Sequence, residues 1–482
     1  MSVPSPRPAV QGLPVYKPGK SAEVAMKEQG LATAIKLASN ENPYAPLPSV
    51  VAAVERAASA TLGRYADHRA TALREALASR YGLAAEQVAV GCGSVGLLQQ
   101  LLLAYCDPGD EVLYGWRSFE AYPIYTQTVG GTAVAVPNRC EALDMAGVVG
   151  AVTEHTRMVF VTSPNNPTGT AVRHDELVAL LAAVPESCVV VLDEAYHEYT
   201  TGAHVPRALE LLAGHPNLVV LRTFSKAFGL AALRVGYLLA HADVVAAVDR
   251  VLVPFAVNGL GQVAALASLE ADDELGERVN RTILERERVV ATLRGLGLSV
   301  PDPQANFVWL PGGDATVALT LKLESQGVVT RPFPGEGVRV TVGTPAENDQ
   351  FLGALQVCVD PLELREHWRL ARGDLAAQVQ ATVERVDALQ ERLVAAVVGD
   401  HPVAWPALAA QALAWPAELD AVLGGVLPAG PAAAASAGDH LVTVQRGLDH
   451  VRAAVAGCDD RDCARVAPAV DRLLGAVETQ VP

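Results

Sequence analysis

Short runs of aliphatic and β-branched residues, separated by helical segments, constrain the fold of this chain more than any other feature. Helices are expected between the runs, for example at Val95–Cys106 and His174–Val184. Continuous apolar runs are typical of strands that are buried on both faces. The alternation therefore predicts an α/β fold with a layered sheet. Its strands are expected at Val88–Ser94, where a loop follows the strand, and at Glu111–Tyr114, Met158–Thr162, Val189–Asp193, Val219–Arg222 and Val235–Leu239.

A second region, from about residue 254 to 358, mixes charged helices with strands. Arg278–Leu296 is expected to form a long helix rich in Arg and Glu, and Ala305–Leu310 and Gly337–Val342 are expected to be strands. This mixture predicts a smaller α+β domain beside the first. The proposed division is an N-terminal arm at 1–44, a large domain at 45–253 and a small domain at 254–358.

The character of the chain changes after residue 358. Hydrophobic residues recur at steps of three and four between Leu375 and Val397, which predicts an amphipathic helix. A Pro/Trp segment and a linker at 430–438 follow, and two more helical runs close the chain. Residues 359–482 are therefore predicted to form a helical appendage without identifiable chemistry, either an interaction module or a helical cap.

Composition excludes several classes of partner. The chain has 37 basic and 53 acidic residues, a net charge of −16 that disfavours binding to nucleic acid. The seven cysteines are scattered without metal-ligand spacing, which predicts reduced thiols and no metal site. The N-terminus has no apolar run typical of a signal peptide, and the apolar stretches are too short to span a bilayer. A cytoplasmic protein without membrane segments is expected.

One lysine follows a buried strand within LRTFSKAFGLAALRVGY, at Leu221–Tyr237. A lysine that forms a Schiff base must be held in place, partly desolvated and close to cations, so that its pKa falls. Lys226 fits this description, and Ser225 and Arg234 offer contacts for a phosphate group. The alternative for this residue alone is a solvated surface lysine.

Polar residues also follow the neighbouring strands. Asp193 ends a buried strand, where a carboxylate can keep the pyridine nitrogen of pyridoxal 5′-phosphate (PLP) protonated, and Tyr196 lies three residues further on. Asn166 belongs to SPNNPTG after another strand. Taken alone, Asp193 serves equally well as a cap for the next loop, and the Asn turn is a common structural turn. Ligands bind, however, at the carboxyl ends of parallel strands.

A glycine loop and an aromatic segment complete the series. GCGS at Gly91–Ser94 opens a helix directly after a strand, an arrangement that favours phosphate but also occurs as a plain tight turn. GWRSFEAYP at Gly115–Pro123 places aromatic residues after the next strand, where an aromatic ring stacks on a cofactor or joins the core. Because all these features follow successive strands in order, they favour one common site.

The sequence resembles fold-type I, PLP-dependent aminotransferases of the histidinol-phosphate aminotransferase-like group. The resemblance covers roughly residues 8–358 and implies a large domain with a mostly parallel sheet, a smaller α+β domain, bound PLP and a homodimer with its active site at the subunit interface. The motifs that carry it are LASNENP, RYAD, SPNNPTG, DEAY, TFSKAFGLA, QANFVWL and VRVTVGTPAEND.

The resemblance implies a role for each matching position. Lys226 would hold the cofactor as a Schiff base and move a proton as general base, and Asp193 would pair with the pyridine nitrogen. The remaining implied contacts are Tyr196 and Asn166 with the phenolic oxygen, Phe119 with the ring face, Gly93, Ser94, Ser225 and Arg234 with the phosphate, Tyr65 with the phosphate of the neighbouring subunit, Arg339 with the substrate α-carboxylate, and Tyr16 and Arg331 with the substrate side chain.

A narrower match favours the aromatic-amino-acid aminotransferases of this group. GLPVYKPGK, GCGS followed by LLQQLL, and GWRSFEAYP are similar to them. The resemblance then implies transfer of an amino group from Phe, Tyr or Trp to 2-oxoglutarate. The alternatives are a histidinol-phosphate aminotransferase and a PLP-dependent decarboxylase or lyase on the same fold. Arg339 favours transamination over the last of these, because it would hold the carboxylate in place.

Overall fold

The structure is a computed structural model that describes residues 4–15 and 19–358. Of these, the residues up to 292 and from 300 to 358 group into one compact unit. The predicted helical appendage at 359–482 lies outside the described residues, and so does Tyr16.

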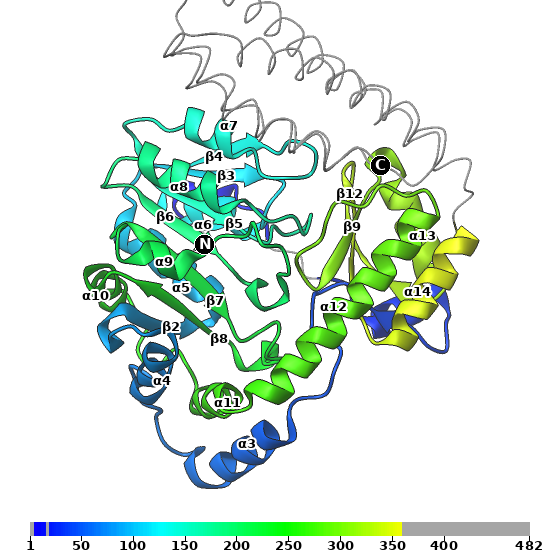
Figure 1. Cartoon of the computed structure of the whole chain (residues 1–482), viewed down its shortest axis with the longest axis horizontal. Helices are drawn as coiled ribbons and strands as arrows, with labels where there is room; N and C mark the ends of the chain where they lie inside the picture. Colours follow the sequence, from blue (N-terminus) through cyan, green and yellow to red (C-terminus); the bar gives the residue numbers. More distant parts are fainter. Residues whose placement is uncertain (1–3, 16–18, 359–482) are drawn as a thin grey trace, which may run out of the picture. The chain divides into compact units, whose positions relative to one another are not determined.

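A seven-stranded sheet forms the centre of the larger part of this unit (Figure 1). All neighbouring strands are parallel except that β8 runs antiparallel to both of its neighbours. The mostly parallel α/β sheet predicted from the sequence is therefore confirmed. In spatial order the strands are β2 (Val88–Cys92), β8 (Val235–Ala240), β7 (Leu218–Thr223), β6 (Val189–Asp193), β5 (Thr156–Thr162), β3 (Glu111–Trp116) and β4 (Thr132–Pro137).

The central strands are buried on both faces, as their continuous apolar sequence predicts. In β6, Val190 and Leu192 belong to the core on one face, whereas Val189 and Val191 belong to the core on the other. This alternation follows from the two-residue repeat of a strand. One face is covered by α5 (Gly93–Tyr105), α6 (Ala121–Val129) and α10 (Ala242–Arg250). The other is covered by α4 (Thr71–Tyr81), α7 (Met145–Gly150), α8 (His174–Ala183), α9 (Ala208–Leu212) and α11 (Gly259–Leu269), and α3 (Pro48–Thr61) packs on α11.

A smaller antiparallel sheet lies beside the large one and joins β11 (Arg331–Phe333), β12 (Gly337–Thr341) and β9 (Phe307–Pro311). The N-terminal segment adds to this part of the chain, because β1 (Ile35–Lys36) pairs in parallel with β10 (Val328–Val329). The associated helices are α2 (Ala22–Gln29), α12 (Asp272–Gly295), α13 (Thr316–Ser325) and α14 (Pro345–Cys358), and a short α1 (Pro8–Gln11) precedes them. Figure 1 shows the part of the N-terminal segment that contains α2 and β1, in blue, beside α13 and α14.

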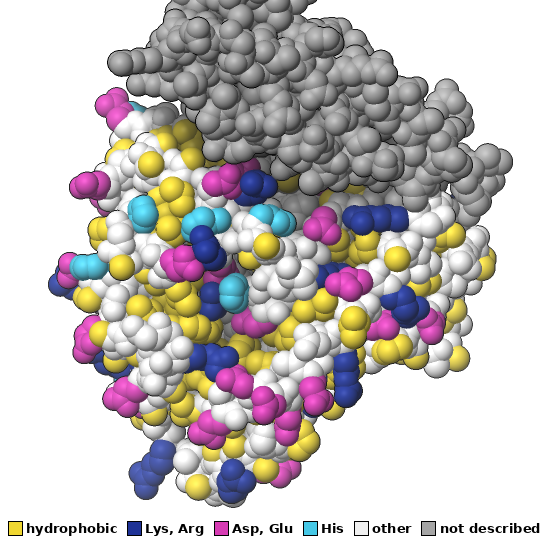
Figure 2. Space-filling model, in the orientation of Figure 1, with side chains coloured by type: hydrophobic (Ala, Val, Ile, Leu, Met, Phe, Trp, Pro, Cys, Tyr) yellow, Lys and Arg dark blue, Asp and Glu magenta, His cyan; other side chains and the backbone are white. Residues whose placement is uncertain are grey.

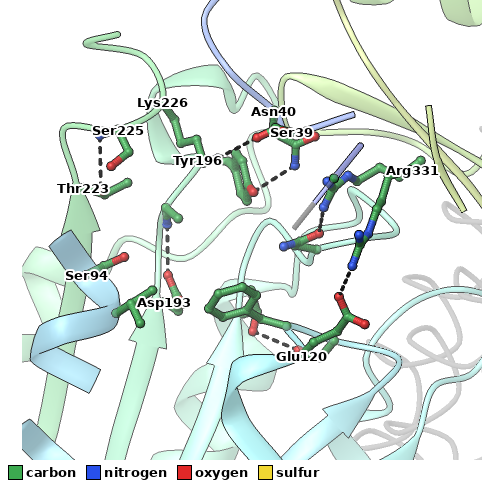
Figure 3. A pocket seen from close by; sticks show the side chains of 18 of the residues that line it. Ser39, Asn40, Ser94, Glu120, Asp193, Tyr196, Thr223, Ser225, Lys226 and Arg331 are labelled. Atoms are coloured by element: carbon green, nitrogen blue, oxygen red, sulfur yellow. Dashed lines mark hydrogen bonds and ion pairs between the residues drawn. The ribbon is translucent and has the colours of Figure 1, made fainter. Parts of the chain in front are cut away.

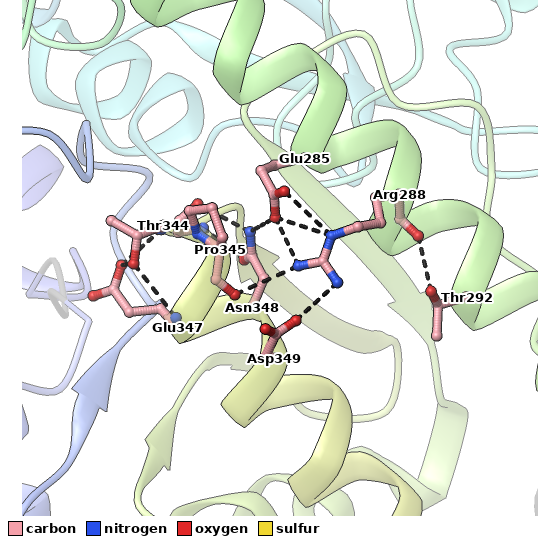
Figure 4. Close-up of polar contacts among 9 residues, drawn as sticks. Glu285, Arg288, Thr292, Thr344, Pro345, Glu347, Asn348 and Asp349 are labelled. Atoms are coloured by element: carbon pink, nitrogen blue, oxygen red, sulfur yellow. Dashed lines mark hydrogen bonds and ion pairs between the residues drawn. The ribbon is translucent and has the colours of Figure 1, made fainter.

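Polar contacts anchor α14 to the long helix α12 (Figure 4). The buried Asn348 side chain donates to Glu285 Oε2 at 2.9 Å. Arg288 on α12 bridges Glu285 on the same helix and Asp349 on α14. Its Nη1 lies 2.8 Å from Asp349 Oδ1, and its Nη2 lies 2.8 Å from Glu285 Oε2. Loss of the Asn348–Glu285 hydrogen bond would leave a buried amide without a partner, which is costly. The ion pairs of Arg288 are partly exposed and contribute less to stability.

Acidic and basic side chains are interspersed over the face shown in Figure 2, with hydrophobic side chains between them. No helix in the described part of the chain has the length and apolar character needed to cross a bilayer. Within residues 4–15 and 19–358, no group of three or more His, Cys, Asp or Glu side chains is arranged to bind a metal ion.

Candidate active site

A pocket opens at the carboxyl ends of the parallel strands, as expected for this class of sheet. Thr162, Asp193 and Thr223, which end β5, β6 and β7, line its floor. Residues from the small sheet and from the N-terminal segment, including Arg331 and Asn40, line the opposite side (Figure 3). The pocket therefore collects side chains from three parts of the sequence that lie far apart.

Asp193 is buried in the floor of this pocket. Its Oδ2 accepts a hydrogen bond from Tyr122 Oη at 2.8 Å, and its Oδ1 accepts one from the Ala195 N–H at 3.2 Å. Burial raises the pKa of the carboxyl to about 6, although these hydrogen bonds and the Lys226 charge act in the other direction. An ionised carboxylate in such a site gains strongly from a cationic hydrogen-bond donor.

Lys226 follows β7 and projects into the same pocket. Its Nζ donates to the Ser39 carbonyl at 3.3 Å and lies 5.7 Å from the centre of the Tyr196 ring. Burial lowers the pKa of the ammonium to about 7, and the charges of Arg339 and Arg234 add to the effect. Above that pH the amine is mostly neutral, which is the form that attacks a carbonyl.

The N-terminus of α5 and the residues around Arg234 form a cradle that suits a phosphate. Arg234 Nη1 lies 3.3 Å from Ser225 Oγ, and Ser94 stands in the first turn of the helix. Gly93 has φ +71°, and a Cβ at this position would lie 2.4 Å from Arg234 Nη2. A helix N-terminus with an adjacent arginine is an anion site. Glycine is favoured at position 93 because its φ lies in the left-handed region, which is strained for other residues.

Aromatic and amide groups complete the cofactor half of the pocket. Tyr196 Oη accepts a hydrogen bond from Asn40 Nδ2 at 3.0 Å. Phe119 lines the pocket and meets the Tyr122 ring edge-on at 5.6 Å between ring centres. A planar ring with a phosphate arm fits this arrangement of an aromatic face, a carboxylate, an amine and an anion cradle. The residues present therefore fit PLP.

The small sheet contributes two arginines that lie side by side. Arg331 on β11 is paired in register with Arg339 on β12. Arg339 donates to the Asn166 amide oxygen and, at 2.8 Å, to the Ala38 carbonyl. Arg331 Nη2 instead lies 2.8 Å from Glu120 Oε2. Two guanidinium groups thus face one pocket, with partners of different charge.

The structure brings most of the sequence-predicted site residues together. Gly93 directly precedes the pocket residue Ser94, whereas Tyr65 lies apart from the lining, 85% exposed and stacked on Phe255. The predicted residues that line the pocket are Ser94, Phe119, Asn166, Asp193, Tyr196, Ser225, Lys226, Arg234, Arg331 and Arg339.

Sequence reasoning placed Tyr122 near the cofactor but missed its bond to Asp193, and it did not single out Asn40 or Glu120. Asn40 bonds Tyr196, Tyr122 bonds Asp193, and Glu120 pairs with Arg331. Asn40 belongs to LASNENP, and the other two belong to GWRSFEAYP, so both motifs carried a signal. Their partners lie 71 to 211 residues away. Spacing along the chain therefore gave no indication of these pairs.

Comparison with known proteins agrees with the fold and the pocket, which together define a PLP-dependent transferase. Residues 32–355 match the family model of class I and II aminotransferases. The aromatic amino acid aminotransferase of Thermobifida fusca is 54% identical over 346 residues, 72% of this chain and 95% of that protein. The protein of the same name from Streptomyces coelicolor is 51% identical over 355 residues, 73% of this chain and 97% of the relative.

A solved structure gives the same answer. Histidinol-phosphate aminotransferase from Sinorhizobium meliloti, determined in complex with PLP, is 31% identical, with a TM-score of 0.68 over 74% of this chain and 98% of that one. The chain belongs to the class I and II aminotransferase family. It is an aminotransferase that uses PLP, which confirms the activity and cofactor predicted from the sequence and favours transamination over the decarboxylase or lyase alternative.

Proposed function

We propose that this enzyme transfers the amino group of Phe, Tyr or Trp to 2-oxoglutarate, giving the aromatic 2-oxo acid and glutamate. The observation that carries the proposal is that one pocket contains both the cationic side chain of Arg339 and the aromatic rings of Phe119 and Phe333. An amino acid with an apolar ring needs one anion contact and otherwise gains by burying its side chain, roughly 1.5–3 kcal/mol for a phenyl group. The names of relatives with 54% and 51% identity support the same substrate class.

The proposed roles of the chain's own residues follow from their positions. Bound PLP supplies an electron-withdrawing ring that stabilises negative charge at the substrate Cα. Lys226 Nζ takes a proton from that carbon and later returns it, a task suited to its pKa of about 7. Asp193 keeps a proton on the ring nitrogen, because an ionised carboxylate in a buried site strongly favours a cationic partner. Gly93, Ser94, Ser225 and Arg234 would hold the phosphate, Phe119 would contact the ring, and Tyr196 and Asn166 would bond the phenolic oxygen.

Arg339 is the proposed anchor of the substrate α-carboxylate, and its replacement tests that role. Lysine keeps the charge but loses the planar fork that matches a carboxylate. We expect Arg339→Lys to lower kcat/KM for phenylalanine by about 10- to 100-fold, the range expected when one strong charge-assisted contact is weakened. Steady-state kinetics would measure the effect. A change of less than twofold would contradict the assignment.

A homodimer is part of the proposal, with Tyr65 of each subunit reaching the cofactor phosphate of the other. Tyr65 is 85% exposed and stacks on the exposed Phe255 with ring centres 4.6 Å apart. Leu62 and Val253, 75% and 63% exposed, lie close to these residues in sequence. A group of exposed apolar side chains is a common mark of a protein interface. Sedimentation equilibrium would separate a dimer from a monomer.

Product analysis tests the proposed reaction. Incubation of the PLP-loaded enzyme with phenylalanine and 2-oxoglutarate should give phenylpyruvate and glutamate in equal amounts. Release of carbon dioxide or ammonia in place of the oxo acid would contradict the proposal. Histidinol phosphate is the second candidate donor, and the match to the Sinorhizobium meliloti structure is the observation that favours it.

A further inference from the structure

The ion pair between Glu120 and Arg331 occupies the side of the pocket that the small sheet provides (Figure 3). Glu120 directly follows Phe119 and precedes α6, whereas Arg331 stands on β11. The two charged atoms are 2.8 Å apart, and the side chains are 34% and 14% exposed. The attraction between the two charges is therefore partly screened by solvent, and the pair is not fully buried.

Arg331 differs from its neighbour Arg339 in the charge of its partner. Both guanidinium groups approach the Phe333 ring, at 5.6 and 5.9 Å from its centre. Arg339 donates to the amide oxygen of Asn166 and to a backbone carbonyl, which are neutral acceptors. Arg331 donates to a carboxylate. The two arginines are thus neighbours across β11 and β12, and Glu120 offsets the charge of Arg331 directly at the pocket.

This difference matters because the proposed reaction uses two unlike substrates in one pocket. An aromatic amino acid carries one carboxylate and a neutral side chain, whereas 2-oxoglutarate and glutamate carry a second carboxylate. A lone arginine beside a neutral ring would be a desolvated, uncompensated charge, which is costly. An ion pair that is partly exposed is worth little and is easily opened. A second carboxylate can therefore replace Glu120 as the partner of Arg331.

We propose that Glu120 is a specificity-determining residue of this pocket. It offsets the charge of Arg331 while a neutral aromatic side chain is bound, and it gives up Arg331 when the distal carboxylate of a dicarboxylic substrate enters. The same competition lowers the affinity of the pocket for other anionic side chains. The inference rests on the proposed function, since it explains how one pocket accepts both of its substrates.

The test is Glu120→Gln, which keeps the shape of the side chain and removes its charge. The amino-donor half-reactions of glutamate and phenylalanine are measured separately by stopped-flow absorbance of the PLP-loaded enzyme. Without a competing carboxylate, Arg331 should favour the anionic donor. We expect the ratio of the second-order rate constants, glutamate over phenylalanine, to rise about fivefold, the upper range for loss of one partly exposed charge partner. A ratio within twofold of the wild-type value would overturn the proposal.

Glu336→Gln provides the matched control. Glu336 accepts from Arg117 Nε at 2.8 Å, and that pair joins the same two segments as Glu120 and Arg331, with side chains 34% and 20% exposed. Neither Glu336 nor Arg117 lines the pocket. The control should leave the ratio unchanged, and an equal rise would show that loosening of the two segments, rather than the pocket charge, changes the specificity.

The double variant Glu120→Gln/Arg331→Gln tests whether the effect acts through the arginine. The rise in the ratio should disappear in this variant, because no cation remains to be released. A rise that persists would contradict the proposal. The outcome is separate from that of the proposed function. If the wild-type enzyme prefers histidinol phosphate to phenylalanine, the proposed function fails, while the effect of Glu120 on the ratio is still measured.

Discussion

Replacement of Lys226 by alanine is expected to abolish turnover almost completely. The amine is the only group of this side chain able to take the proton from the substrate, and general-base catalysis alone contributes about 10²–10⁴-fold. We expect kcat to fall at least about 10³-fold, since the covalent hold on the cofactor is lost as well. The purified wild-type protein should show a PLP absorbance band that borohydride bleaches. The same reduction should attach the cofactor covalently to the chain. The Ala variant should bind PLP without a reducible linkage.

Lys322→Ala is the control for this variant, because Lys322 lies exposed on α13, away from the pocket. It should keep wild-type activity and the reducible linkage. Wild-type turnover in Lys226→Ala would show that another residue carries the chemistry.

Asp193→Asn is expected to have the second-largest effect. Asparagine keeps the size of the side chain and can still accept the hydrogen bond from Tyr122, but it lacks the charge that holds a proton on the ring nitrogen. Loss of a charge-assisted contact at the reacting centre is worth several kcal/mol, so we expect kcat to fall by about 10²-fold or more. Steady-state kinetics at saturating PLP would measure the fall. An unchanged kcat would contradict the role of Asp193.

A second aspartate provides the comparison. Asp144 caps α7 by accepting from the Gly147 N–H, and asparagine is an equally good cap. Asp144→Asn should therefore leave both stability and kcat unchanged. Together the two variants separate the loss of a carboxylate in the pocket from the loss of a carboxylate elsewhere.

The strands of the large sheet were predictable where both of their faces are buried. In β6 and β7 each hydrophobic residue packs in one of two cores, which requires an unbroken apolar run that is visible in the sequence. The edge strand β4 was missed, because most of its residues are partly or fully exposed, unlike those of the other edge strand, β2. Its sequence, TAVAVP, is accordingly short of large aliphatic residues. The pairing of β1 with β10 was also not predictable, since strands of two residues have no periodicity.

The site was predictable only in part, for a similar physical reason. Asp193 and Lys226 follow neighbouring parallel strands, whose carboxyl ends must meet at one edge of the sheet. Contacts made across the pocket obey no such rule. The partners Glu120 and Arg331 are 211 residues apart and meet only because the small sheet packs beside the large one. Burial and pairing of these side chains therefore required the three-dimensional structure.

The central claim is that the pocket is built for an aromatic amino acid, and one comparison tests it most directly. Steady-state kcat/KM is measured for phenylalanine and for histidinol phosphate at saturating 2-oxoglutarate. A phosphate monoester forced against Phe119 and Phe333 would lose solvation, and it would have to compete with Glu120 for the nearby Arg331. We predict a higher kcat/KM for phenylalanine. A clear preference for histidinol phosphate would contradict the claim about the substrate, while leaving the fold, the cofactor and Lys226 unaffected.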